Sequence, residues 1–174
     1  MITSSIARNL INFLLFQAGW FLCVAFPGML TAAIAFGLVA VHLVLVSQNA
    51  AREWQFILLG TVLGTVLDGL WFRTGVMADT SGAAVIWTPI WLVGVWAVFM
   101  TTIAHSLSWM GQKAWFPFVF APVAGPFAYW SASKLGAVTL PDLPVSLIAL
   151  AVGWLVIFPS LMHIRQRFYP ELAS

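Results

Sequence analysis

An aspartate inside an apolar segment is the first candidate for chemistry. Asp68 lies within residues 54–73, WQFILLGTVLGTVLDGLWFR, and Gly60, Gly64 and Asp68 fall four residues apart. Four residues advance a helix by about 400°, so the three positions share one helical face. A carboxylic acid at membrane depth is costly unless it faces protein, which makes Asp68 a candidate site residue. The glycines let a neighbouring helix approach closely on the same face.

Other polar side chains fall into two layers when their depth is counted at about 1.5 Å per residue. Tyr129 reaches the same depth as Asp68, in the outer third of the membrane, and Trp91 lies near that level. His42 and His105 fall in the inner third, together with Asn12. The layers are separated by roughly 15 Å, which argues against a direct contact between Asp68 and His105. The candidate ligand-binding residues are Asp68, Tyr129, Trp91, Trp87, Arg73, His105 and His42.

The elements that position these residues follow from composition. The 174 residues are 62% hydrophobic and 7% charged, whereas a soluble domain carries about 25% charged residues. The chain is therefore expected to be an integral membrane protein, with the bacterial inner membrane as its location. A net charge of +2 from dispersed basic residues does not favour nucleic acid as a partner. The single Cys23 excludes a cysteine metal cluster.

Six apolar segments approach the roughly 20 residues that cross a bilayer as a helix. The sequence thus predicts an all-α bundle of six transmembrane helices that forms a single polytopic domain, residues 1–174. With the amino terminus inside, five Lys and Arg residues lie on the cytoplasmic side and two lie outside. The positive-inside rule then places both termini in the cytoplasm. The predicted helices span residues 10–26, 29–47, 54–72, 89–109, 115–133 and 145–163.

The fifth predicted helix is the candidate wall of a cavity. It carries Pro117, Pro122 and Pro126, and each interior proline frees a backbone carbonyl. Such backbone is tolerated at membrane depth only where protein or a water-filled cavity satisfies it.

Each candidate also has a structural interpretation. Asp68 is either functional or a structural carboxyl group bonded to Tyr129 or to an indole N–H. His42 and His105 are more often satisfied core histidines, and no HxxxH or HxxE spacing supports a metal site, so neither a metal nor a cofactor is predicted. The Gly60/Gly64 face packs either within the chain or in a homo-oligomer.

Several short motifs together resemble a family of small multi-pass bacterial inner-membrane proteins, domain-of-unknown-function family 2878. The resemblance covers nearly the whole chain and implies no chemistry, because the family has no assigned activity. The resemblance favours a lipid rather than an ion as the molecule on which this protein acts. The motifs are FQAGW at 16–20, LGTVLDGLW at 63–71, TPIW at 88–91, HSLSW at 105–109, GPFAYW at 125–130 and KLGAV at 134–138.

We therefore expect an intramembrane cavity that binds a membrane lipid or an apolar small molecule, accessory to membrane-lipid metabolism or a stress response. Asp68 and Tyr129 would orient a polar head group, Trp87 and Trp91 would line the mouth, and Arg73 or Lys134 would meet a phosphate.

One alternative is a small transporter or proton-coupled carrier, with Asp68 titrating and the histidines continuing a relay. Another is an intramembrane lipid-modifying enzyme with Asp68 or His105 as general acid or base. A third is a structural scaffold that contacts a partner through the Gly60/Gly64 face. Catalytic residues are not assigned by any motif.

Overall fold

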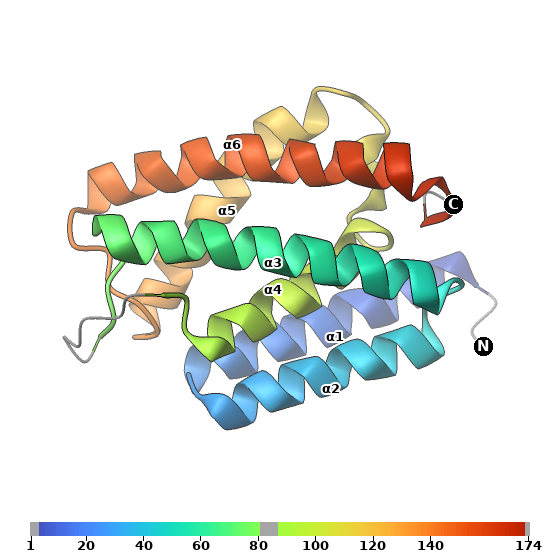
Figure 1. The fold of residues 1–174 in the computed structure, drawn as a ribbon, viewed down its shortest axis with the longest axis horizontal. Coiled ribbons are helices and arrows are strands. Elements are labelled where there is room, and N and C mark those ends of the chain that lie inside the picture. Colours follow the sequence, from blue (N-terminus) through green and yellow to red (C-terminus); the bar gives the residue numbers. More distant parts are fainter. Residues whose placement is uncertain (1–3, 81–86, 173–174) are drawn as a thin grey trace.

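The computed structural model describes residues 4–80 and 87–172 (Figure 1). Within these ranges the chain is helical, and its only β-type pairing is an isolated bridge between Ala78 and Thr139. The predicted all-α class is confirmed for this part of the chain. The helices are α1 (Ser5–Ala25), α2 (Met29–Leu45), α3 (Ala50–Thr74), α4 (Ile90–Ile103), α5 (Phe116–Lys134) and α6 (Leu143–Phe168), with the short 3-10 helices η1 (Ser108–Gly111) and η2 (Pro170–Leu172).

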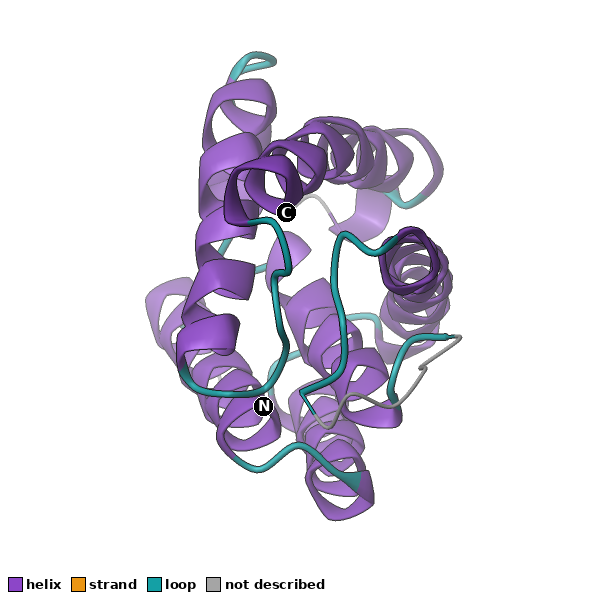
Figure 2. Cartoon of the chain, turned by 90° about the vertical axis from the view of Figure 1, so that its left-hand side faces the viewer, coloured by secondary structure: helices purple, strands orange, loops and turns teal. Residues whose placement is uncertain are grey.

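Three of the helices, α1, α3 and α6, are long and apolar enough to cross a membrane, while α2 and α4 are apolar but shorter. Successive helices run in alternating directions, so both ends of the described chain lie at the same end of the bundle (Figure 1). The connections between α1 and α2 and between α5 and α6 gather at the opposite end, which faces the viewer in Figure 2. This arrangement agrees with two termini on one side of a membrane.

The fourth helix is shorter than predicted. A helix over residues 89–109 was expected, but α4 ends at Ile103. The carbonyl oxygen of Thr102 accepts from the backbone N–H groups of both His105 and Leu107, so the chain turns there. Threonine hydroxyls also bond to backbone oxygens one turn back, which competes with helix continuation. His105 consequently lies in a turn rather than on a helix.

α4 is the central helix of the bundle. It packs against α1, α2 and α3, and α6 packs against α5 and α3. In Figure 1, α5 runs obliquely behind α6 and α3. Most of the α4 side chains are buried, as expected for a helix that is apolar on all sides. The freed carbonyl of Ile103 at its end accepts from Nη1 of the buried Arg165 on α6 at 2.5 Å.

Two stacked indoles connect α4 to α6. The rings of Trp96 and Trp154 lie 5.4 Å apart at 9°. Trp96 also lies directly on Gly64 of α3, where a Cβ atom would come within 2.1 Å of its ring. Trp154 lies on Gly125 of α5 in the same way, at 2.2 Å. The two stacked rings therefore require glycine at positions 64 and 125, where each ring lies directly on the helix backbone.

The Gly60/Gly64 face is filled by α4 of the same chain. A Cβ atom at Gly60 would lie 2.1 Å from the methyl carbon of Met100, next to the contact between Gly64 and Trp96. Close packing within the chain is thus the correct interpretation of these glycines. A homo-oligomer remains a prediction, but this face is not free to form it.

We predict that Gly64→Ala lowers the free energy of unfolding by about 1–3 kcal/mol, because the new methyl group overpacks the Trp96 ring. Thermal unfolding in mild detergent, followed by circular dichroism, measures this effect. Gly37→Ala is the matched control, since a Cβ atom there meets nothing within 4 Å. Equal stability of the two variants would contradict the stacking argument.

Candidate functional site

The carboxylate of Asp68 is fully buried and holds two hydrogen bonds. Its Oδ1 accepts from the hydroxyl of Tyr129 at 2.6 Å, and its Oδ2 accepts from the indole Nε1 of Trp96 at 2.8 Å. The predicted match in depth between Asp68 and Tyr129 is therefore confirmed. Both carboxylate oxygens have a partner, so the carboxylate is structurally satisfied.

The indole that reaches Asp68 is Trp96, not Trp91. The two tryptophans lie five residues apart, which is about 140° around α4. Trp96 faces α3, whereas Trp91 faces the space between α4 and α5. Depth counting places residues along a helix but not around it, which is why Trp91 was the expected neighbour.

A large cavity lies between the α1/α4 pair and the α5/α6 pair, and we call it the apolar cavity. Its volume is about 630 Å³. Tyr129 and Trp91, two of the predicted site residues, line it, and Trp96 forms part of the same wall. Asp68 lies behind this wall and acts on the cavity only through Tyr129 and Trp96. The other lining residues include Phe16, Gln17 and Trp20 of α1, Phe99 of α4, Trp109 of η1, Phe120, Ala128 and Ser131 of α5, and Trp154 and Phe158 of α6.

The apolar cavity opens at the side of the bundle. Three of its aromatic lining residues are well exposed, namely Trp109, Phe120 and Phe127. They lie in η1 and α5. The rim of the apolar cavity is therefore formed in part by exposed aromatic rings.

The remaining predicted residues of the outer layer lie apart from this cavity. Trp87 is half exposed and packs against Gly69 of α3, while Arg73 is exposed at the end of α3. Among the described residues, neither belongs to the cavity lining. The structure therefore does not bring Trp87 and Arg73 together with Tyr129 at one mouth.

The two histidines of the inner layer converge on a glutamate. Nε2 of His42 lies 2.6 Å from Oε1 of Glu53, and Nε2 of His105 lies 2.9 Å from the same oxygen. Glu53 and His42 are each 1% exposed, and the side chain of His105 is 12% exposed. These residues come from α2, α3 and the turn after α4, so three separate elements assemble the group. We call it the His–Glu cluster.

A buried amide supports the cluster. Nδ2 of Asn12 donates to Oγ1 of Thr101 at 2.9 Å and lies 3.3 Å from Nδ1 of His42. Its Oδ1 accepts from the hydroxyl of Ser106 at 2.6 Å. Asn12 thus links α1 to α4 and fixes the His42 ring, which confirms the predicted inner layer.

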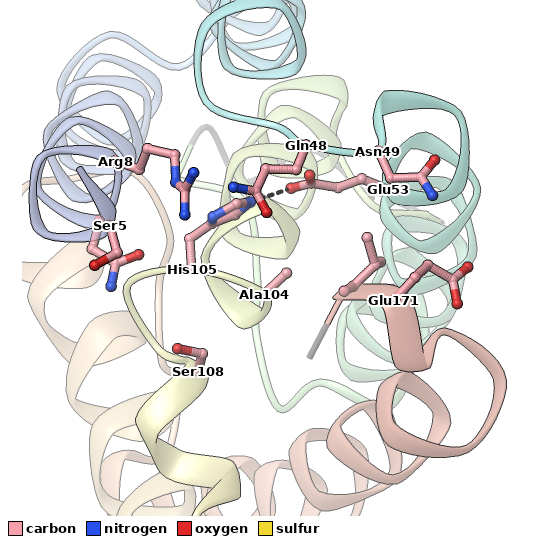
Figure 3. A pocket seen from close by; sticks show the side chains of 11 residues that line it. Ser5, Arg8, Gln48, Asn49, Glu53, Ala104, His105, Ser108 and Glu171 are labelled. Carbon is pink, nitrogen blue, oxygen red and sulfur yellow. Dashed lines mark hydrogen bonds and ion pairs between the residues drawn. The ribbon is translucent and has the colours of Figure 1, made fainter. Parts of the chain in front are cut away.

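A smaller pocket reaches the His–Glu cluster from the end of the bundle that carries the termini (Figure 3). This polar cavity has a volume of about 50 Å³, and Glu53, His105 and Arg8 are among the residues that line it. Glu171 lies at its edge, where the hydrogen bond from Arg52 lowers the pKa of the Glu171 carboxyl and favours its ionised form. In Figure 3 the side chain of His105 points toward Glu53 between Arg8 and Gln48.

Glu53 is the site residue that sequence reasoning missed. The third helix was expected to begin at Trp54, but α3 begins at Ala50, where the side chain of Asn49 caps it by accepting from Arg52 N–H. Glu53 therefore lies inside the helix, seven residues before Gly60 and on the same face. Extending the Gly60, Gly64 and Asp68 stripe by two turns toward the amino terminus would have found it.

The two polar networks are separate. Asp68 bonds to Tyr129 and Trp96, and the His–Glu cluster bonds to Asn12 and its partners; among the described residues the two hydrogen-bond networks share none. Fifteen residues along α3 separate Asp68 from Glu53, which corresponds to about 22 Å. The predicted absence of a direct contact between Asp68 and His105 is therefore confirmed.

Comparison with known proteins identifies one family. Residues 9–160 match the family described as "Protein of unknown function (DUF2878)", which confirms the resemblance based on the sequence motifs. The matched region includes every residue of both polar networks. No curated protein and no solved structure matches the chain.

We predict that Asp68→Leu lowers the free energy of unfolding by about 2 kcal/mol or more, because the Tyr129 hydroxyl and the Trp96 N–H lose their acceptor in a buried place. Asp68→Asn should cost much less. Its amide oxygen can accept from Trp96, and its nitrogen can donate to the Tyr129 oxygen. Thermal unfolding in detergent compares the two variants. If the two variants lost equal free energy of unfolding, the negative charge of Asp68 rather than its hydrogen bonds would be what stabilises the fold.

Proposed function

This chain belongs to the DUF2878 family, and we propose that it is a bacterial inner-membrane protein whose apolar cavity binds a membrane lipid. Its role would be accessory to membrane-lipid metabolism or a stress response. The six helices would all span the membrane, with both termini in the cytoplasm, as the distribution of Lys and Arg favours. α2 and α4 are shorter than a typical span.

The observation that carries this proposal is the apolar cavity itself. Its volume of about 630 Å³ lies within the range of about 300–1,000 Å³ that is typical of small-molecule sites. Aromatic and aliphatic side chains make most of its wall, so an acyl chain or another apolar group would be bound mainly by burial of its surface. The opening at the side of the bundle favours a ligand that comes from the bilayer rather than from water.

A few polar groups in the wall would orient the ligand. The Tyr129 hydroxyl donates its proton to Asp68 and keeps a lone pair that can accept from a ligand hydroxyl or amide. Gln17 on α1 lies in the wall as well and supplies both a donor and an acceptor. Lys134 ends α5 five residues beyond Tyr129, so a phosphate of a lipid head group at that end would meet a positive charge. Asp68 would act as a positioning residue.

A proton-coupled transporter and an enzyme that uses Asp68 as its acid or base have less support. A proton relay from Asp68 to the histidines needs a continuous polar path, whereas the two described networks share no residue. A role of Asp68 as a general acid or base needs contact with the substrate. Its carboxylate is fully buried, with both oxygens bonded to the protein.

We predict that Ala128→Trp displaces the bound lipid, because Ala128 lines the apolar cavity and an indole there fills part of it. Native mass spectrometry after purification in mild detergent, combined with lipid extraction, measures what remains bound. One lipid class should be enriched over the bulk membrane in the wild type and reduced several-fold in the variant.

The matched control is Val123→Trp. Val123 lies on the same helix, is 69% exposed and is not part of the cavity lining among the described residues. It should keep the lipid at the wild-type level. Equal lipid content in the wild type, Ala128→Trp and Val123→Trp would rule out the apolar cavity as the binding site.

A further inference from the structure

From the geometry of the His–Glu cluster, we propose that His42, Glu53 and His105 form a binding site for one divalent transition-metal ion. The inference is independent of the lipid proposal, since no described residue lines both the apolar cavity and the polar cavity. Two imidazoles and one carboxylate are ligands that suit Zn²⁺, Fe²⁺ and Co²⁺.

The donor atoms already converge. One ligand atom from each of the three side chains lies within 4.8 Å of the others. In a tetrahedral site with bonds of about 2.0–2.1 Å, ligand atoms lie about 3.3 Å apart. The present contacts of Glu53 Oε1 with the two Nε2 atoms are 2.6 and 2.9 Å. The two contacts of Glu53 therefore have to lengthen by less than about 1 Å, while the most distant pair of ligand atoms, which lie within 4.8 Å of each other, has to close toward the same spacing.

Charge balance favours a cation at this place. The Glu53 carboxylate is 1% exposed, and an unpaired charge is costly when buried. The neighbouring Arg52 does not compensate it, because its guanidinium bonds to Glu171 and to the carbonyl oxygen of Phe168. Among the described residues, the polar partners of Glu53 are the two histidines. A divalent ion held by this carboxylate and two neutral imidazoles would offset the negative charge of Glu53 and leave one net positive charge, which an anionic fourth ligand would balance.

The polar cavity gives the ion an open coordination position. Glu53 and His105 form part of its wall (Figure 3), and its volume of about 50 Å³ suffices for one water molecule. Three protein ligands with a water in the fourth position are typical of catalytic zinc sites rather than of structural ones. Arg8 lies in the same wall, so an anionic ligand at the open position would be favoured by its charge.

The hydrogen bonds of Asn12 must change when the ion binds. Nδ2 of Asn12 faces Nδ1 of His42 at 3.3 Å, so His42 accepts there and carries its proton on Nε2. A metal at Nε2 requires the proton on Nδ1 and an acceptor opposite it. Rotation of the Asn12 amide by half a turn supplies that acceptor, and the Ser106 hydroxyl can reverse its role because it both donates and accepts. The rotation also breaks the bond from Asn12 Nδ2 to the Thr101 carbonyl and the bond from the Ser106 backbone N–H to Asn12 Oδ1, so this turn has to shift when the ion binds.

The test is metal reconstitution of the full chain in mild detergent. The protein is stripped with a chelator and titrated with Co²⁺, whose visible absorption reports the ligands, and then with Zn²⁺ as competitor. We expect one Co²⁺ per chain, displaced by Zn²⁺, with X-ray absorption that indicates two imidazoles and oxygen ligands. A wild-type protein that binds no Co²⁺ and no Zn²⁺ saturably would overturn the proposal and leave a hydrogen-bonded carboxylate only.

Variants assign the site. His42→Gln, Glu53→Gln and His105→Gln should each lose the Co²⁺ absorption, whereas His163→Gln should keep it, because His163 is the one remaining histidine and lies exposed on α6. Loss of the signal in His163→Gln alone would place the metal elsewhere. Tryptophan fluorescence checks that each variant is folded, and the wild-type X-ray absorption decides the question where a variant does not fold.

Asn12→Asp tests the supporting contact. A carboxylate at this position accepts from Nδ1 of His42, and such partners change metal affinity by about 10–100-fold. We expect tighter Co²⁺ binding by a factor in that range. Unchanged or weaker binding in the folded variant would show that His42 does not bind the ion through Nε2.

Discussion

The carboxylate of Asp68 sets the strongest constraint on this bundle. A fully buried carboxylate needs donors for both oxygens, and these come from two other helices, α4 through Trp96 and α5 through Tyr129. Trp96 can reach Asp68 only because Gly64 leaves room for its ring, and its other face stacks on Trp154 of α6. One acidic group thus fixes the relative positions of four helices and, with them, the wall of the apolar cavity.

The parts of this arrangement that sequence reasoning predicted depend on simple periodicity. Apolar segments and turn residues located all six helices, and the regular rise per residue matched Asp68 with Tyr129 and placed Asn12 near His42. Both inferences use distance along a helix, which is fixed by backbone geometry alone. The family was likewise identified from short motifs.

The parts that failed depend on orientation and on helix ends. The partner of Asp68 is Trp96 rather than Trp91, because the rotation of α4 is decided by packing on the α3 glycines. His105 lies in a turn, since threonine hydroxyls and the bonds to Thr102 end α4 early. Glu53 lies in the site because the Asn49 cap starts α3 at Ala50, one turn before the predicted start at residue 54. The rotation of a helix and the hydrogen bonds at its ends cannot be detected in a hydropathy profile.

The side opening of the apolar cavity has a consequence for how occupancy is controlled. Under the proposed function, a lipid that entered past exposed rings such as Phe120 and Phe127 would exchange by lateral diffusion and would never cross water. Its binding equilibrium would then be governed by its mole fraction in the bilayer rather than by its aqueous concentration. A change in membrane composition would alter the loading of this protein directly, without any change in its affinity.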